Sequence, residues 1–225
     1  MNFLSHYYFD REVTNPERIL GMVLPDLLKN ANKKWVIHPN RHHAALRADK
    51  DLNNILEGWN RHLAVDAYFH SSDFFYRHTQ QIRTAIAPLI TDSPVRPSFL
   101  AHIGLELMLD SLLITQNQLD AHNFYTLIAS VNSKKVDNFL KVNQIFHTNS
   151  FFDFFEEFIS SAYLHSYSDY ESITYALEKI CMRLWNKPFT IAQKSQLTDT
   201  FNAYQEVLLK DYQLIFDQIE SEIND

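Results

Sequence analysis

The chain has 225 residues, of which 46% are hydrophobic and 14% aromatic, and its formal net charge is −7. A chain of this length and composition can bury a substantial core, which excludes an intrinsically disordered protein. The negative charge argues against a nucleic-acid-coating surface, because such surfaces place Lys and Arg against phosphates. We therefore expect a globular protein with no nucleic acid partner.

The small number of glycines and cysteines limits the architecture further. Only three glycines occur, whereas a β-sandwich or a doubly wound fold uses many more in its turns, so helices are favoured. The single cysteine, Cys181, excludes an internal disulfide framework and is expected to be a buried small hydrophobic residue. The sequence has neither a signal peptide pattern nor an apolar run of about 18 residues. We expect a soluble cytoplasmic protein without a membrane span.

Hydrophobic periodicity and proline positions predict helices along the whole chain. Pro16 follows an asparagine N-cap, Pro188 precedes the last helix, and Pro25 should kink or restart a helix near Asp26. No repeat, low-complexity tract or linker indicates a domain boundary, so we expect one compact all-α domain over residues 1–225. The predicted helices span residues 2–9, 16–31, 50–70, 72–90, 95–115, 120–131, 134–147, 150–165, 169–185 and 190–222.

One predicted helix carries a stripe of ionisable residues. In GWNRHLAVDAYFHSS, at residues 58–72, His62, Asp66 and His70 are four residues apart. With about 3.6 residues per turn, positions at this spacing share one face of a helix. The stripe therefore predicts a polar line along an otherwise apolar and aromatic helix.

A second predicted helix repeats this arrangement. FLAHIGLELMLDSLL carries His102, Glu106 and Asp110 at the same spacing and is apolar nearly all round, so we expect it to be buried. Buried carboxylates are costly unless they pair with a cation or bind a metal. Two such helices facing each other would supply ligands for a dinuclear metal site, as in helical bundles. Salt bridges and hydrogen bonds between the helices are the alternative.

Four more residues are candidates. His6 lies in MNFLSHYYF and Asp26 in LGMVLPDLL, both apolar surroundings in which a hydrogen-bonded core histidine and a helix cap are the alternatives to metal binding. Arg61 and Arg183 are the basic groups that we consider for binding a phosphate, with ordinary surface salt bridges as the alternative.

Other conspicuous residues indicate no site. His38, His42 and His43 lie in a polar, loop-rich segment, where we expect solvated side chains, and the aromatic run NSFFDFFEEF is expected to fill the core. The sequence contains no G-x-S-x-G, no Walker-type glycine loop and no cysteine with an activating partner. Nucleophilic esterase, NTPase and thiol chemistries therefore have no support.

The segments MNFLSHYYF, ILGMVLPDLL, GWNRHLAVDAYFHSS and LELMLDSLL resemble, in order and approximate spacing, those of acyl carrier protein phosphodiesterases. The resemblance covers the first half of the chain. It implies an all-helical, HD-domain-like phosphodiesterase of lipid metabolism, a hydrolase that uses a divalent metal, usually manganese. Such enzymes release the 4′-phosphopantetheine arm from holo acyl carrier protein, which would be the partner and substrate. The family motif positions fall on His6, Asp26, His62, Asp66, Glu106 and Asp110.

The chain departs from the family pattern in several places. The second Asp that follows the family's HRxID motif is His70 here, and the Asp-His pair is Asp110-Ser111. The family's FVKG has become LLKN, and His102 has no counterpart. These departures leave the substrate and the activity open.

The pairs His62 with Asp66 and His102 with Glu106 also resemble ligand motifs of zinc-dependent phospholipase C and P1 nuclease, although their N-terminal Trp ligand is missing here. Both resemblances imply a phosphoesterase with Mn or Zn, in one or two ions, and a non-ligating Asp110 or His70 that assists proton transfer. A non-catalytic helical adaptor that kept the fold is a third interpretation. The predicted metal ligands are His6, Asp26, His62, Asp66, His102 and Glu106.

An acidic enzyme that acts on an acidic carrier protein needs a local basic surface. A solvated basic face without a partner is the alternative. The early basic cluster consists of Lys29, Lys33, Lys34, Arg41 and Arg47.

Overall fold

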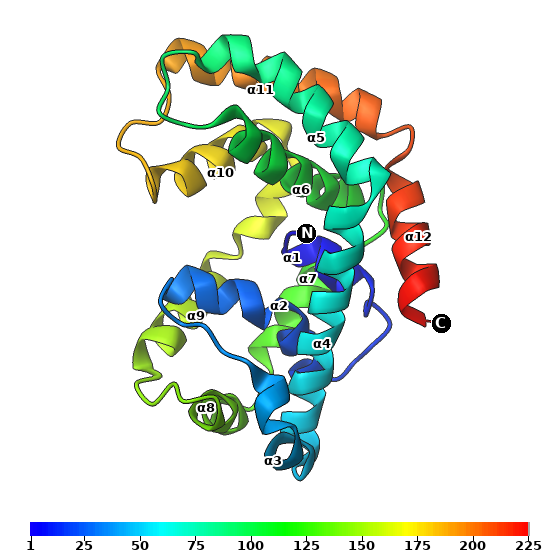
Figure 1. Cartoon of the computed structure of the whole chain (residues 1–225), viewed down its shortest axis with the longest axis vertical. Coiled ribbons are helices and arrows are strands. Elements are labelled where there is room, and N and C mark those ends of the chain that lie inside the picture. Colours follow the sequence, from blue (N-terminus) through cyan, green and yellow to red (C-terminus); the bar gives the residue numbers. More distant parts are fainter. Residues whose placement is uncertain (225) are drawn as a thin grey trace. The chain divides into compact units, whose positions relative to one another are not determined.

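A computed structural model describes residues 1–224, and all regular secondary structure in this part of the chain is helical. The all-α prediction is confirmed. Figure 1 shows the helices in chain order. They are α1 (Phe3–Tyr8), α2 (Pro16–Ala31), η1 (Pro39–His42), α3 (His43–Arg47), α4 (Lys50–Ser71), α5 (Asp73–Ile86), η2 (Ala87–Ile90), α6 (Pro97–Thr115), α7 (Ala121–Ala129), α8 (Ser133–Val142), α9 (Asn149–Ser161), η3 (Tyr163–Ser168), α10 (Tyr170–Met182), α11 (Ile191–Leu208) and α12 (Tyr212–Asn224).

Polar side chains cap several helices where the sequence predicts a start. The Asn15 side chain accepts a hydrogen bond from the third backbone N–H after it, and Pro16 is the first residue of α2. Ser72 does the same for α5, and Thr190 forms a reciprocal capping box with Gln193 at the start of α11. These contacts satisfy N–H groups that the first helical turn leaves without partners. The predicted Pro16 start is confirmed, and α2 continues through Pro25.

Several predicted boundaries are wrong. The last predicted helix is two helices, because the backbone tightens into short-range turns after Leu208 and resumes a helix only at Tyr212. The predicted helix 134–147 ends at Val142, and Gln144 then has a positive φ of 68°. The segment around His42, expected to be loop, forms a 3-10 helix and the short helix α3. Neither glycine nor proline marks the breaks after Leu208 and Val142, whereas Pro39 is the first residue of the 3-10 helix.

The chain divides into two compact units, each built from separated segments. Unit 1 contains residues 1–5, 67–118 and those from Ser166 onward, whereas unit 2 contains residues 6–66 and 119–165. Helices α1 and α4 contribute residues to both units. Neither unit is one contiguous stretch, so no single cut in the sequence separates them.

Helix α6 lies at the centre of unit 1, packed against α5 and α10 (Figure 1). Most of its side chains are buried, as expected of a helix that is apolar on every face. Gly104 allows the Phe201 ring of α11 to approach closely, since an added Cβ would lie 2.6 Å from that ring. Among the described helices, α6 alone is long and apolar enough to cross a membrane, and its burial fits the core of a globular protein. The cytoplasmic location remains a prediction.

A polar network in unit 1 fastens the turn between α11 and α12. The buried His78 of α5 has its Nδ1 atom 2.7 Å from the Tyr204 hydroxyl and its Nε2 atom 3.3 Å from Asp211 Oδ2. Arg77 binds the same carboxylate at 2.6 Å. Burial lowers the pKa of His78, while the Asp211 carboxylate opposes that shift. The ring is therefore held mainly in its neutral form.

In unit 2, α2 packs against α7 and α9, and α3 against α8. The aromatic run of α9 contributes Phe151, Phe155 and Phe158 to the core, as predicted. Of the histidines expected at the surface, His38 and His43 are exposed and His42 is half-buried. In unit 1, Cys181 is fully buried, as predicted.

Candidate metal sites

Imidazole and carboxylate side chains gather in two groups in the described part of the chain. Within each group, one donor atom from every residue lies within 4.8 Å of the others. One group is in unit 2 and the other in unit 1, so the two helical stripes and His6 do not form a single group. We call them the His62 group (His6, His62 and Asp66) and the His70 group (His70, His102 and Glu106).

A close crossing of α2 and α4 positions the His62 group. Gly21 of α2 and Gly58 of α4 meet there, and a Cβ added to Gly58 would lie 2.1 Å from the Arg18 carbonyl oxygen and 2.7 Å from the Met22 nitrogen. Only hydrogen atoms fit between the two backbones, because glycine has no Cβ. His62 lies one helical turn beyond Gly58 and so reaches the backbone of α2 directly.

The contact with α2 fixes the tautomer of His62. Its Nδ1 atom lies 2.8 Å from the Met22 carbonyl oxygen, and a carbonyl only accepts, so Nδ1 carries the hydrogen. The Nε2 atom then faces Asp66 Oδ2 at 3.5 Å. In a neutral ring this nitrogen is a lone pair opposite a carboxylate, and a proton or a metal ion between the two would remove their repulsion. Histidine ligands of metals are commonly oriented by such a second hydrogen bond.

His6 stacks on His62 and faces the same carboxylate. The ring centroids are 3.8 Å apart, and His6 Nε2 lies 3.3 Å from Asp66 Oδ1. His6 is completely buried, and neither of its ring nitrogens has a hydrogen-bond partner among residues 1–224. Burial and then the neighbouring His62 lower the pKa of His6 to about 3. The ring is therefore neutral at physiological pH, the form that binds metals.

Asp66 joins the two rings through its two oxygens. Burial raises the pKa of Asp66, but the interactions with His6 and His62 outweigh it and hold the pKa well below its ordinary value. The nitrogen–oxygen distances of 3.3 and 3.5 Å match the roughly 3.3–3.6 Å between ligand atoms of a tetrahedral metal with bonds of about 2.0–2.2 Å. The donor set therefore fits a divalent metal, and neither ring nitrogen of His6 has a hydrogen-bond partner in the described chain that would compete with the metal.

Asp26, also a predicted ligand, lies beside this group without belonging to it. It is half-buried on α2, and burial raises its pKa while the nearby His62 lowers it. The ammonium group of Lys29 is 3.9 Å from one of its oxygens. Asp26 is thus an additional carboxylate that interacts electrostatically with His62.

The two arginines considered for phosphate binding lie in different surroundings. Arg61 donates a hydrogen bond to the Phe9 carbonyl oxygen at 3.2 Å, and its Nε atom is 3.6 Å from Asp10. Arg183 is exposed at the end of α10. Arg61 holds the segment after α1 against α4, and a phosphate-binding role for either arginine stays a prediction.

The His70 group joins the C-terminal end of α4 to α6 within unit 1. His70 Nε2 lies 3.1 Å from His102 Nε2 and 3.4 Å from Glu106 Oε1, and His102 Nε2 lies 3.0 Å from the same oxygen. The Phe75 ring stands edge-on to both imidazoles, with centroids 5.0 Å away. His70, expected to assist proton transfer, therefore lies with two predicted ligands. No spacing within one helix could have revealed this pairing.

The N-terminal amino group shares the Glu106 carboxylate, at 3.2 Å from Oε1. Burial raises the pKa of Glu106, but this ammonium and the two histidines outweigh it, so the pKa lies below its ordinary value. Glu106 is therefore an ionised, anionic ligand in this group.

Asp110, the other residue expected to assist proton transfer, anchors the N-terminal segment. It is fully buried and accepts hydrogen bonds from the Asn2 side chain, from the backbone N–H groups of Leu4 and Ser5, and from the Ser5 hydroxyl. Burial raises its pKa to about 6, although these hydrogen bonds oppose the shift. Both carboxyl oxygens are occupied, and the proton-transfer role stays a prediction.

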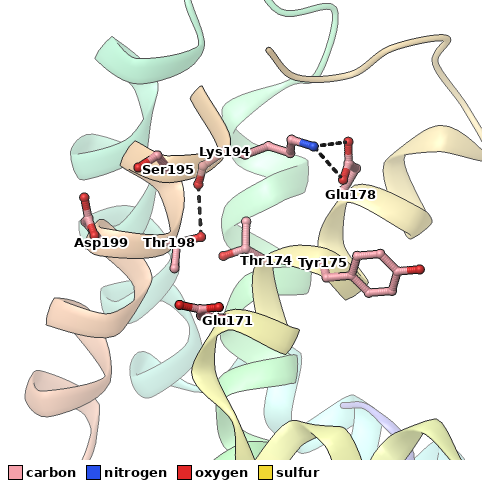
Figure 2. Close-up of a pocket in the computed structure, with 8 residues that line it drawn as sticks. All are labelled: Glu171, Thr174, Tyr175, Glu178, Lys194, Ser195, Thr198 and Asp199. Atoms are coloured by element: carbon pink, nitrogen blue, oxygen red, sulfur yellow. Dashed lines mark hydrogen bonds and ion pairs between the residues drawn. The ribbon is translucent and has the colours of Figure 1, made fainter. Parts of the chain in front are cut away.

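A surface pocket of about 380 Å³ lies between α10 and α11 in unit 1 (Figure 2). Lys194 crosses it to Glu178 at 3.3 Å, and the hydroxyl of the buried Thr174 has no hydrogen-bond partner in the described chain. Neither metal-ligand group contributes to its wall. The lining residues are Glu171, Thr174, Tyr175, Glu178, Lys194, Ser195, Thr198 and Asp199.

No protein-family model, curated protein or solved structure matches this chain.

Proposed function

We propose that this protein is a metal-dependent phosphodiesterase whose divalent metal, manganese or zinc, is held by His6, His62 and Asp66. The observation that carries the proposal is the pair of stacked imidazoles whose Nε2 atoms both face one carboxylate, at 3.3 and 3.5 Å. Two neutral rings and an ionised carboxylate form a suitable donor set for such a metal. Asp26 is the next carboxylate available to complete it.

When bound, the metal would supply a water of lowered pKa and stabilise charge on the phosphodiester. The protein's own residues orient the donor atoms and keep them in the protonation state that binds a metal. Met22 orients His62 through Nδ1, burial keeps His6 unprotonated, and Asp66 holds both rings in place through its two oxygens. The ligands therefore need little rearrangement on binding, which favours affinity.

We further propose that the diester is the 4′-phosphopantetheine linkage of holo acyl carrier protein. The support is the order of the four sequence segments and the exposed basic cluster that begins in the last turn of α2. Lys29 begins that cluster and lies 3.9 Å from Asp26, so the positive charge starts beside the proposed centre. An acidic carrier protein would be attracted to this surface.

Metal analysis by inductively coupled plasma mass spectrometry tests the centre. His62→Ala and Asp66→Ala should each bind about one equivalent of metal fewer than the wild type, because a lost ligand weakens a site with few donors. His42→Ala is the matched control, since His42 belongs to neither group. Equal metal content in the three variants would refute the centre, and a wild-type protein without stoichiometric metal would favour the adaptor.

The substrate is tested with purified protein, manganese and holo acyl carrier protein. Release of 4′-phosphopantetheine appears as a mass loss on the carrier, and His62→Ala should abolish it. If bis-p-nitrophenyl phosphate is cleaved and the holo carrier is untouched at every metal tried, the phosphodiesterase stands without this substrate. A zinc-dependent phospholipase- or nuclease-like activity then becomes the better interpretation.

A further inference from the structure

We propose that His70, His102 and Glu106 form a second metal site that binds zinc and is independent of the site proposed for phosphodiester hydrolysis. All three residues lie in unit 1. His102 and Glu106 lie one turn apart on α6, and His70 comes from the end of α4. Two of the three, His70 and His102, occupy positions at which the chain departs from the phosphodiesterase motifs.

Three donor atoms, one from each of the three side chains, converge on one point. The three pairwise distances, 3.0, 3.1 and 3.4 Å, form a nearly equilateral triangle of two imidazole nitrogens and one carboxylate oxygen. Ligand atoms of a tetrahedral zinc ion with bonds of about 2.0–2.2 Å are roughly 3.3–3.6 Å apart. Three atoms at nearly this spacing place an ion above their common face with little movement.

The protons available to the two imidazoles do not satisfy all three contacts. Two Nε2 atoms 3.1 Å apart cannot both direct a hydrogen at the other, so the contact between the two rings holds at most one proton. A single proton cannot satisfy all three contacts with good geometry, because a hydrogen bond weakens steeply as it bends. A metal ion bound to all three atoms replaces the proton and uses every lone pair.

The identity and openness of the site follow from its residues. Two imidazoles with one carboxylate suit zinc, and these are the same donor types that the His62 group offers. The side chains of His70 and His102 are 33% and 39% exposed, so solvent reaches the ion and can fill a fourth position. This donor set, with an open position, is the arrangement found in catalytic rather than closed structural zinc sites.

The surroundings hold the ligands in place. Phe75 packs edge-on against both rings, which restricts their rotation. The Met1 amino group at 3.2 Å from Glu106 Oε1 balances the charge of the carboxylate, and a bound zinc ion would displace or share that contact. The contact accounts for the ionised Glu106, but it does not account for the two facing imidazoles.

The test titrates metal-free, full-length protein with Co²⁺ as a spectroscopic substitute for zinc, followed by Zn²⁺ competition. It is done in the His62→Ala background, so that the other proposed centre contributes no metal. We expect about one equivalent of Co²⁺ with the visible absorption of a four- or five-coordinate site. Adding His102→Ala should remove it or weaken binding roughly 100-fold or more. Adding His122→Ala, an exposed histidine of unit 2, should change nothing.

Glu106→Gln in the same background guards against misfolding, because it keeps the size of the side chain and removes only the anionic ligand. Circular dichroism should be unchanged while Co²⁺ binding falls. Absence of Co²⁺ binding to the His62→Ala protein, or binding that persists with His102→Ala, overturns the second site. Neither result bears on the proposed phosphodiesterase, which fails instead if the wild type retains the same metal content as His62→Ala.

Discussion

At the scale of single residues, the contacts of an ionisable side chain indicate whether it can serve as a metal ligand or has a structural role. Met22 accepts the Nδ1 hydrogen of His62, and this backbone contact determines which ring nitrogen is free. Asp110 shows the opposite outcome, since its oxygens are both taken by the N-terminal segment. The same residue types therefore serve as candidate ligands in one place and as a structural anchor in another.

The role of Asp110 leads to a stability prediction. Asp110→Ala leaves the buried donors of Leu4 and Ser5 without acceptors, which should cost about 2–4 kcal/mol of unfolding free energy. Urea denaturation measures the change. Asp92→Ala, in an exposed loop, is the control and should cost little. A change at Asp110 no larger than at Asp92 would show that the anchor is not needed for stability.

His78 leads to a pH prediction. Burial lowers its folded-state pKa below the unfolded value of about 6.5, so the unfolded chain binds the proton more strongly as the pH falls. The stabilisation is fully present above that value and is lost progressively below it. Unfolding free energies measured between pH 7 and pH 5 should therefore fall less in His78→Gln than in the wild type. The exposed His122→Gln should follow the wild type; parallel curves for all three proteins would contradict the assignment.

At the scale of elements, the close crossing of α2 and α4 at two glycines determines where His62 lies. Gly21 and Gly58 let the backbones touch, and His62 follows one turn later. The two glycines therefore help to form the candidate site, although they contact no ligand atom.

Gly58→Ala tests that link. The new Cβ would overlap the Arg18 carbonyl and the Met22 nitrogen, so the helices must separate, at a cost of about 2–4 kcal/mol. Metal affinity at the His62 group should fall with it, because His62 moves away from Met22. The control is Gly104→Ala, whose Cβ meets only the Phe201 ring in unit 1. Equal metal titration curves for Gly58→Ala and the wild type would show that metal binding does not depend on the close crossing of α2 and α4.

Helix signals in the sequence were reliable where local chemistry determines the structure. The asparagine cap before Pro16 and the apolar surface of α6 are examples. The break after Leu208 is not predicted by turn residues, because no glycine or proline marks it, and the next helix buries Phe216 in the core. The candidate ligands were recognisable from spacing, but their division into two groups depends on contacts between segments. The Met22 carbonyl belongs to the backbone and leaves no signal in the sequence.

At the scale of the whole molecule, an excess of negative charge coexists with one basic stretch. The net charge is −7, yet the side chains of the early basic cluster are all exposed in unit 2. If an acidic carrier protein is the partner, as proposed, its long-range repulsion would have to be overcome by local attraction, which weakens with salt.

Charge reversal of this cluster should reduce cleavage of the holo carrier by about tenfold or more at low salt, with a smaller difference at high salt. The change comprises Lys33→Glu, Lys34→Glu, Arg41→Glu and Arg47→Glu. Hydrolysis of bis-p-nitrophenyl phosphate is the internal control and should be preserved, because that diester needs no docking surface. Equal losses on both substrates would assign the cluster to folding or to the centre itself.

The rate at which the single thiol of the chain is chemically modified can report on internal motion of the protein. Cys181 is fully buried in α10, and burial raises its pKa to about 12, so the native thiol is shielded from electrophiles and stays protonated. Modification by a maleimide then requires a transient opening of unit 1, and its rate measures how often that opening occurs. A cysteine introduced at an exposed position would instead react at once, so a fluorophore can be attached there without first removing the native thiol.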